Sequence, residues 1–121
     1  MPLQQSPALQ LMREKDLTIS ALADIYGDFL TEKQLTFLRD YYDFDYSLSE
    51  IAEKHGVARQ TVKDAIDSAV RALREFEGRL ELFSRFKEID VLADELLELA
   101  ENEEQRRLIV RIKKCIDLSA R

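Results

Sequence analysis

The side chains best suited to contact a ligand lie between residues 59 and 74. Arginine can pair with guanine edges, glutamine with adenine and aspartate with cytosine, and further arginines can reach phosphates. The candidate nucleic-acid-binding residues are Arg59, Gln60, Thr61, Lys63, Asp64, Arg71 and Arg74. A second candidate contact is the basic segment near the end of the chain, which contains Arg106, Arg107, Arg111, Lys113 and Lys114.

The charge balance opposes a general attraction to nucleic acid. The 121 residues carry 18 basic and 24 acidic side chains, a net charge of −6, and residues 31–76 hold seven bases against nine acids. Nucleic-acid affinity comes largely from neutralising phosphates, so any binding must be local. The alternative interpretation is a solvated face, in which Lys63 pairs with Asp67 and Arg59 with Asp64.

Residue sets for catalysis or metal binding are missing from the sequence. It has one histidine, one cysteine and three glycines, so it offers no metal cluster, no nucleophile with a base and no phosphate-binding loop. We therefore expect no enzyme and no cofactor. Cys115 has no partner for an internal disulfide, and no apolar run approaches membrane-spanning length, which favours a cytoplasmic protein without membrane insertion.

The spacing of apolar residues predicts an all-α fold. Leu17, Ala21, Ile25 and Phe29 recur at every fourth position, with Leu22 and Tyr26 flanking them, and predict a helix ending near residues 27–30. Thr31 and Gln34 fit a capping box at the start of a second helix. The preceding residues 1–12 show no period and are expected to be a flexible lead-in.

A helix-turn-helix is predicted at residues 47–66. Ser47 with Glu50 forms another capping box, and Gly56 can end the short helix that follows it. Ala52, Gly56, Val57 and Val62 supply a small residue at the helix crossing, a glycine in the turn, and apolar anchors for the second helix. His55, just before Gly56, is expected to meet the negative end of the helix dipole.

The last third of the sequence predicts a helical extension. The apolar stripe of the helix-turn-helix continues to Phe86 and is interrupted at Gly78. Residues 88–104 then hold eight acids and no base, and residues 105–121 hold six bases and one acid. Two such helices would attract if folded back, in one chain or across a dimer, and Asn102 with Gln105 could cap the second.

The predicted organisation is a lead-in at 1–12, a helix-turn-helix domain at 13–76 and a C-terminal helical extension at 77–121, which we expect to be the dimerisation region. A long helix leaving a small domain exposes an apolar stripe unless something covers it. We therefore expect a homodimer, with an interface built from Phe83, Phe86, Leu92 and Leu96.

The sequence also resembles known families over residues 22–86. LTEKQLTFLRDYY followed by SLSEIAEKHGVARQTV resembles region 4 of bacterial sigma factors, and LADIYGDFLTEKQ with REFEGRLELFSRF resembles more narrowly the YlxM-type helix-turn-helix proteins. That resemblance implies an accessory or regulatory protein of the signal recognition particle pathway, which would act with the particle's RNA or its GTPase. The alternative is a transcriptional regulator that binds duplex DNA.

Two positions depart from the pattern of the YlxM-type family. Ala58 stands where the family usually has serine, so a hydroxyl able to cap the second helix is lost. Lys63 stands where family members often have an aromatic residue, so no role of that ring carries over to this chain.

Overall fold

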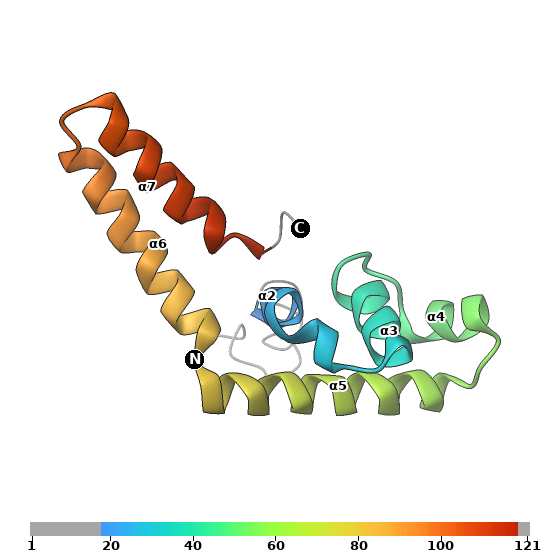
Figure 1. The fold of residues 1–121 in the computed structure, drawn as a ribbon. Coiled ribbons are helices and arrows are strands. Elements are labelled where there is room, and N and C mark those ends of the chain that lie inside the picture. The colour runs from blue at the N-terminus through green and yellow to red at the C-terminus, as the bar shows by residue number, and fades with distance from the viewer. Residues whose placement is uncertain (1–17, 119–121) are drawn as a thin grey trace, which may run out of the picture. The chain divides into compact units, whose positions relative to one another are not determined.

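The computed structural model describes residues 18–118, and the lead-in predicted at residues 1–12 lies outside them. The helices in chain order are α2 (Thr18–Tyr26), the 3₁₀ helix η2 (Gly27–Phe29), α3 (Glu32–Tyr42), α4 (Leu48–His55), α5 (Arg59–Leu80), α6 (Leu82–Leu99) and α7 (Glu103–Cys115), as Figure 1 shows. The described residues contain no strand. The predicted all-α fold is confirmed.

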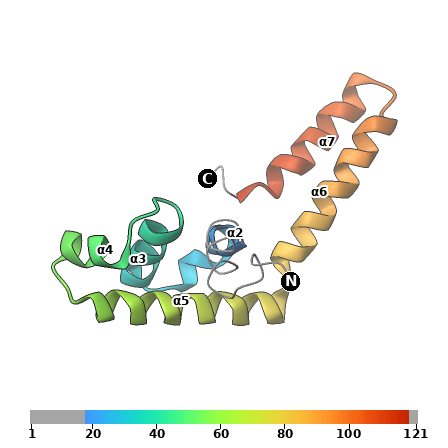
Figure 2. The same cartoon turned by 180° about the vertical axis from the view of Figure 1, so that it is seen from behind.

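The chain divides into two units, Met1–Arg79 and Leu80–Arg121. The first unit contains α2 to α5, and Figures 1 and 2 show α2, α3 and α4 along the same side of the long helix α5. The second unit contains α6 and α7. A helix-turn-helix region followed by a helical extension is thus the order that the sequence predicted.

The buried face of α2 differs from the predicted stripe. Its buried residues are Ile19, Leu22, Ala23 and Tyr26, whereas Phe29 is 70% exposed. The helix changes to a 3₁₀ turn at Gly27, closed by the hydrogen bond from Leu30 N–H to the Gly27 carbonyl at 3.0 Å. A 3₁₀ turn has three residues per turn, so the four-residue spacing does not carry Phe29 onto the buried face.

Both predicted capping boxes are present. The N–H of Gln34 donates to the Thr31 hydroxyl at 3.1 Å, and the N–H of Thr31 donates to Gln34 Oε1 at 3.0 Å. Ser47 and Glu50 form the same reciprocal pair at the start of α4, at 3.0 and 2.8 Å. Each box satisfies two backbone donors that a helix start leaves free, so it fixes where α3 and α4 begin.

Three helices of the first unit share one core cluster. Phe37 of α3, Ile51 and Ala52 of α4, and Val62 and Ile66 of α5 are all buried against one another. The cluster fixes α4 and the first half of α5 against α3. Farther along α5, the Tyr26 hydroxyl donates to Glu77 at 2.7 Å and ties α2 to the same long helix.

Gly78 interrupts the apolar stripe but does not end the helix. Helix α5 runs through Gly78 to Leu80, and the chain breaks at Glu81, whose φ of 54° is left-handed. Gly78 lowers helix propensity by only about 1 kcal/mol, and one glycine need not end a helix. A left-handed residue cannot continue one, so α6 begins at Leu82.

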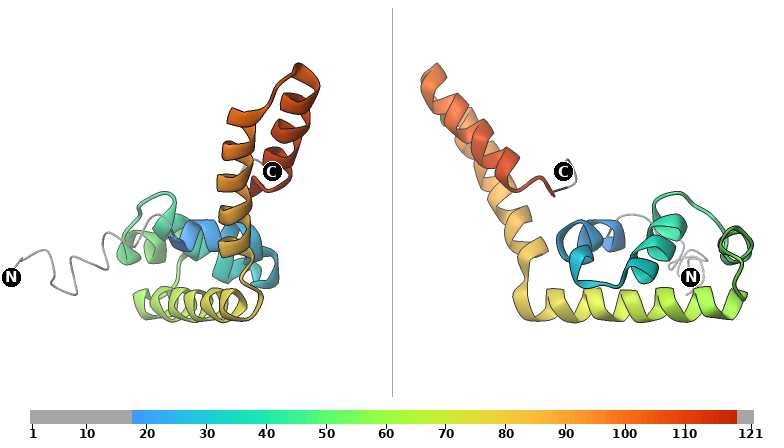
Figure 3. Two further views of the ribbon diagram at one scale, coloured as in Figure 1. Left: turned by 90° about the vertical axis from the view of Figure 1, so that its left-hand side faces the viewer. Right: turned by 45° about the vertical axis from the view of Figure 1, so that its right-hand side comes forward.

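In the second unit, α6 and α7 lie side by side and run in opposite directions (Figure 3). Asn102 caps α7 by accepting a hydrogen bond from the Gln105 N–H at 2.9 Å, as the sequence predicted. Lys113 of α7 donates to Asp90 of α6 at 2.9 Å and also binds Asp94. The oppositely charged helices therefore fold back on each other within one chain.

Candidate nucleic-acid interface

The turn between α4 and α5 has the geometry that the sequence predicted. Gly56 adopts φ 67° and ψ 36°, and the Val57 N–H donates to the Ala52 carbonyl at 3.0 Å. A glycine in the left-handed conformation, together with a hydrogen bond that spans five residues instead of four, is a common way for a helix to end sharply. Ala52 and Val62 are buried, 7% and 0% exposed, so the two helices cross at a small residue and are anchored by an apolar one.

A buried carboxylate that sequence reasoning missed also positions α4. Asp40 of α3 is 4% exposed, and its carboxylate lies 3.0 Å from His55 Nε2 and 3.5 Å from Lys54 Nζ. The His55 ring also meets Phe37 edge-on, with ring centroids 5.1 Å apart. Two basic side chains in the last turn of α4 thus reach across to α3, which fixes the angle of the first helix of the motif.

The seven candidate residues of α5 are all exposed. Val62, Ile66, Ala69 and Leu73 form the buried face of this helix, so the period of 3.6 residues turns most of the others outward. Gln60, Asp64, Asp67, Arg71 and Arg74 follow one another at steps of four and three residues and make a continuous outward stripe. Arg59, Thr61 and Lys63 flank it in the first turns of the helix.

Internal pairing neutralises part of this surface. Lys63 donates to Asp67 at 2.7 Å, as predicted, and this hydrogen bond raises the pKa of Lys63. Asp64 accepts from the Gln60 amide at 2.8 Å, and the predicted pair of Arg59 with Asp64 is not formed within residues 18–118. Gln60 reaches Asp64 because one helical turn separates them, which is the favoured spacing for side-chain pairs.

Three arginines remain as the cations of this surface. Within residues 18–118, Arg59, Arg71 and Arg74 form no ion pair. Their guanidinium groups are exposed on the same helix, at its start and beyond its middle. Phosphates can therefore be contacted at two places along α5, at its start and beyond its middle, and hydrogen-bonding side chains lie between these places.

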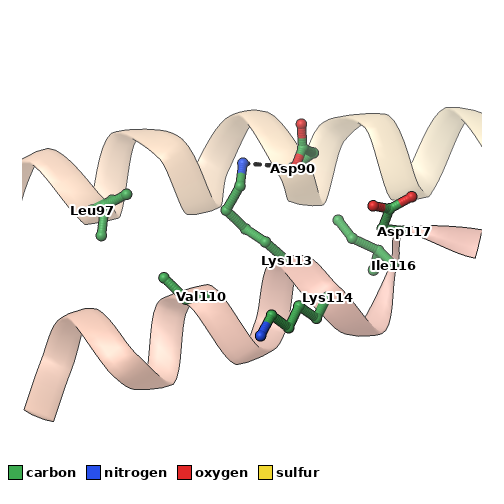
Figure 4. Close-up of a pocket in the computed structure, with 7 residues that line it drawn as sticks. All are labelled: Asp90, Leu97, Val110, Lys113, Lys114, Ile116 and Asp117. Carbon is green, nitrogen blue, oxygen red and sulfur yellow. Dashed lines mark hydrogen bonds and ion pairs between the residues drawn. The ribbon is translucent and has the colours of Figure 1, made fainter. Parts of the chain in front are cut away.

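In the second candidate contact, the basic helix α7, some of the cations are already paired with acidic side chains. Lys113 bridges Asp90 and Asp94, and these hydrogen bonds raise its pKa. Arg106 lies 3.4 Å from Glu103 in the first turn. Figure 4 shows Lys113 reaching across a groove of about 520 Å³ toward Asp90, while Lys114, on the same groove, has no dashed contact.

The four candidate interface residues lie on α6 with different exposures. Phe83 and Phe86 are half-buried, whereas Leu92 and Leu96 are 55% and 49% exposed. Cys115 is an exposed free cysteine. Among residues 18–118 there is no cluster of three or more metal-ligating side chains, and no helix there is long and apolar enough to cross a membrane.

The class of protein follows from comparison with known sequences. The family described as "Putative helix-turn-helix protein, YlxM / p13 like" matches residues 13–114. The chain belongs to this family of helix-turn-helix proteins.

Its relatives include a UPF0122 protein of Malacoplasma penetrans (strain HF-2), which is 45% identical over 72% of this chain and 91% of the relative. UPF0122 proteins of Streptococcus pneumoniae strains Hungary19A-6 and CGSP14 are each 39% identical over 70% of this chain and 77% of the relative. The family match at residues 13–114 covers both the helix-turn-helix and most of the helical extension.

Proposed function

We propose that this chain is a helix-turn-helix accessory or regulatory protein of the signal recognition particle pathway, which binds the particle's RNA or its GTPase. The resemblance to YlxM-type proteins suggests the pathway. The physical support is the outward face of α5, where candidate residues are exposed on a helix held rigidly by the Gly56 turn and the Asp40 contacts.

The observation that supports a nucleic-acid role is the exposure of three arginines on α5. Arg59, Arg71 and Arg74 have exposed guanidinium groups that acids in the described part of the chain do not neutralise. Guanidinium groups bind phosphate through two parallel hydrogen bonds, so these three are the groups that would meet a nucleic-acid backbone.

RNA is favoured over duplex DNA by the acids of the same stripe. Asp64 and Asp67 lie between the arginines, and a helix lying deep in a major groove would bring these carboxylates close to two phosphate strands. A folded RNA can meet the arginines with a single backbone and leave the acids facing away. RNA recognition of this kind depends on shape, which needs few cations.

A DNA-binding transcriptional regulator is the second candidate. Arg59 and Gln60 occupy the first turn of the second helix of the motif, and the N-terminal residues of that helix contact base edges in helix-turn-helix proteins. Arginine recognises guanine and glutamine recognises adenine through paired hydrogen bonds.

Binding measured by fluorescence anisotropy separates these functions. The probes are signal recognition particle RNA, an unrelated RNA of the same length, and random duplex DNA, with the particle's GTPase tested in parallel by biolayer interferometry. We expect the full chain to prefer particle RNA to the other nucleic acids or to bind the GTPase. Preference for duplex DNA, lost in Arg59→Ala and Lys63→Ala while GTPase binding persists, would favour the regulator.

A further inference from the structure

An apolar groove runs between α6 and α7 on the second unit. It has a volume of about 510 Å³, and it is lined by Leu96, Leu99 and Ala100 of the α6 side and by Leu108, Ile109 and Ile112 of α7. Leu99 is 74% exposed and Leu108 is 52% exposed. Leu92, one helical turn before Leu96, extends the same apolar face and is 55% exposed. Of the predicted interface residues, this face therefore contains Leu92 and Leu96.

The unit that carries the groove has a very small interior. Among its described residues, only Ala93 and Ile109 are buried. A chain segment of about 40 residues cannot usually form a stable core by itself and requires metal, disulfides or association. Exposed leucines gathered on one face are the surface that association would cover.

The charges of the two helices restrict what can cover this face. Helix α6 has two basic and five acidic side chains, a net charge of −3, whereas α7 has five basic and two acidic side chains, a net charge of +3. The surface is therefore apolar in the middle, acidic along one side and basic along the other. A surface with this pattern is complementary to itself after a half-turn rotation.

We propose that the occupant of the groove is a second copy of this chain, with the two hairpins forming an antiparallel four-helix bundle. The two-fold axis runs parallel to the helices, so that α6 of one copy lies beside α7 of the other. The other way of stacking the two faces places α6 on α6, where like charges would repel. Charge thus selects one of the two arrangements.

Two charged side chains at the edges of the apolar face distinguish the two arrangements. Glu95 precedes Leu99 by four residues and Arg111 follows Leu108 by three, so each lies at the outer edge of its helix, and both are exposed. In the proposed bundle, Glu95 of one copy lies beside Arg111 of the other. A bundle with α6 on α6 would instead place Glu95 near a second Glu95.

The mass of the full chain in solution tests the proposal. Light scattering and sedimentation equilibrium are expected to give a dimer at micromolar concentrations, and Leu99→Glu is expected to give a monomer with unchanged helical circular dichroism. Val110→Glu is the matched control, since Val110 is 40% exposed and lines the other groove of the hairpin, with Asp90 and Lys113, and it should remain a dimer. A monomeric parent chain, or a dimeric Leu99→Glu, would overturn the proposal.

Charge reversal tests the orientation independently. Glu95→Arg and Arg111→Glu should each weaken the dimer roughly tenfold, and the double variant should recover most of the loss because the pair is restored in the opposite sense. Additive weakening in the double variant would contradict the placement of α6 beside α7 of the second copy.

Discussion

The imidazole of His55 lies 3.0 Å from the carboxylate of Asp40, which is buried between α3 and the end of α4. The two residues are fifteen positions apart, and their contact joins the first helix of the helix-turn-helix to the helix before it. The Lys54 ammonium lies 3.5 Å from the same carboxylate. The position of α4, and with it the turn at Gly56, rests on a charged contact as well as on apolar packing.

Removal of this carboxylate should destabilise the first unit. Asp40→Ala leaves the His55 ring without its acceptor, and hydrogen bonds to charged groups contribute about 2 kcal/mol. We expect the urea midpoint to fall accordingly, as followed by circular dichroism. Glu53→Gln, at an exposed acid of α4, is the control and should leave the midpoint nearly unchanged.

The two glycines of the α4–α5 region should respond oppositely to alanine. Gly56 has φ 67°, so Gly56→Ala should cost about 1–2 kcal/mol even though no atom would contact the added methyl group. Gly78 lies inside α5 with open space around it, so Gly78→Ala should stabilise the helix by about 0.5–1 kcal/mol. Thermal unfolding of both variants checks the pair, and equal effects would refute the turn geometry described above.

The capping box of α4 predicts an acid-dependent contribution to stability. Hydrogen bonding from the Ser47 backbone, followed by its side chain, lowers the pKa of Glu50 below its usual 4.5. Because the folded pKa is the lower one, the contribution is fully present above about pH 4.5 and is lost as the pH falls through the folded pKa.

The variant Glu50→Gln keeps an oxygen for the Ser47 N–H but cannot titrate. Its unfolding midpoint should therefore decline less than that of the parent chain when the pH is lowered from neutral. Parallel pH profiles of the two proteins would show that the Glu50 charge contributes nothing.

A serine at the start of α5 should restore a lost cap. Ala58 directly precedes Arg59 and is exposed, so Ala58→Ser can place a hydroxyl near the free N–H groups of the first turn. We expect a stability gain of about 1 kcal/mol, measured by urea unfolding. Ala58→Val, which enlarges the side chain without an acceptor, is the control and should give no gain.

Local signals in the sequence were sufficient to predict where the short helices begin and end. Thr31 with Gln34, Ser47 with Glu50, and Gly56 each act within one turn, so residue type and spacing determine their contacts. The exposure of the α5 candidates followed from the period of Val62, Ile66, Ala69 and Leu73. These features needed no knowledge of which helices meet.

Two kinds of feature were not predicted: contacts between residues far apart in the sequence, and local conformations that residue type and spacing do not specify. Asp40 could have been suspected because it follows Phe37 by three residues, on the inward face of α3, but its partners lie on another helix. The break at Glu81 has no sequence signal, since glutamate is a good helix former and Gly78 is the poorer one. The pairing of Asp64 with Gln60 instead of Arg59 depends on side-chain conformations that spacing does not specify.

The salt dependence of RNA binding tests the central claim most directly. Three phosphate contacts from Arg59, Arg71 and Arg74 predict that the logarithm of the binding constant falls with the logarithm of salt concentration with a slope of about −2 for single-stranded RNA. The variant with all three arginines replaced by alanine should bind weakly and lose most of this slope, while Arg79→Ala, an exposed arginine near the end of α5, should retain it. Unchanged affinity and slope in the triple variant would contradict the claim that the outward face of α5 is the nucleic-acid interface.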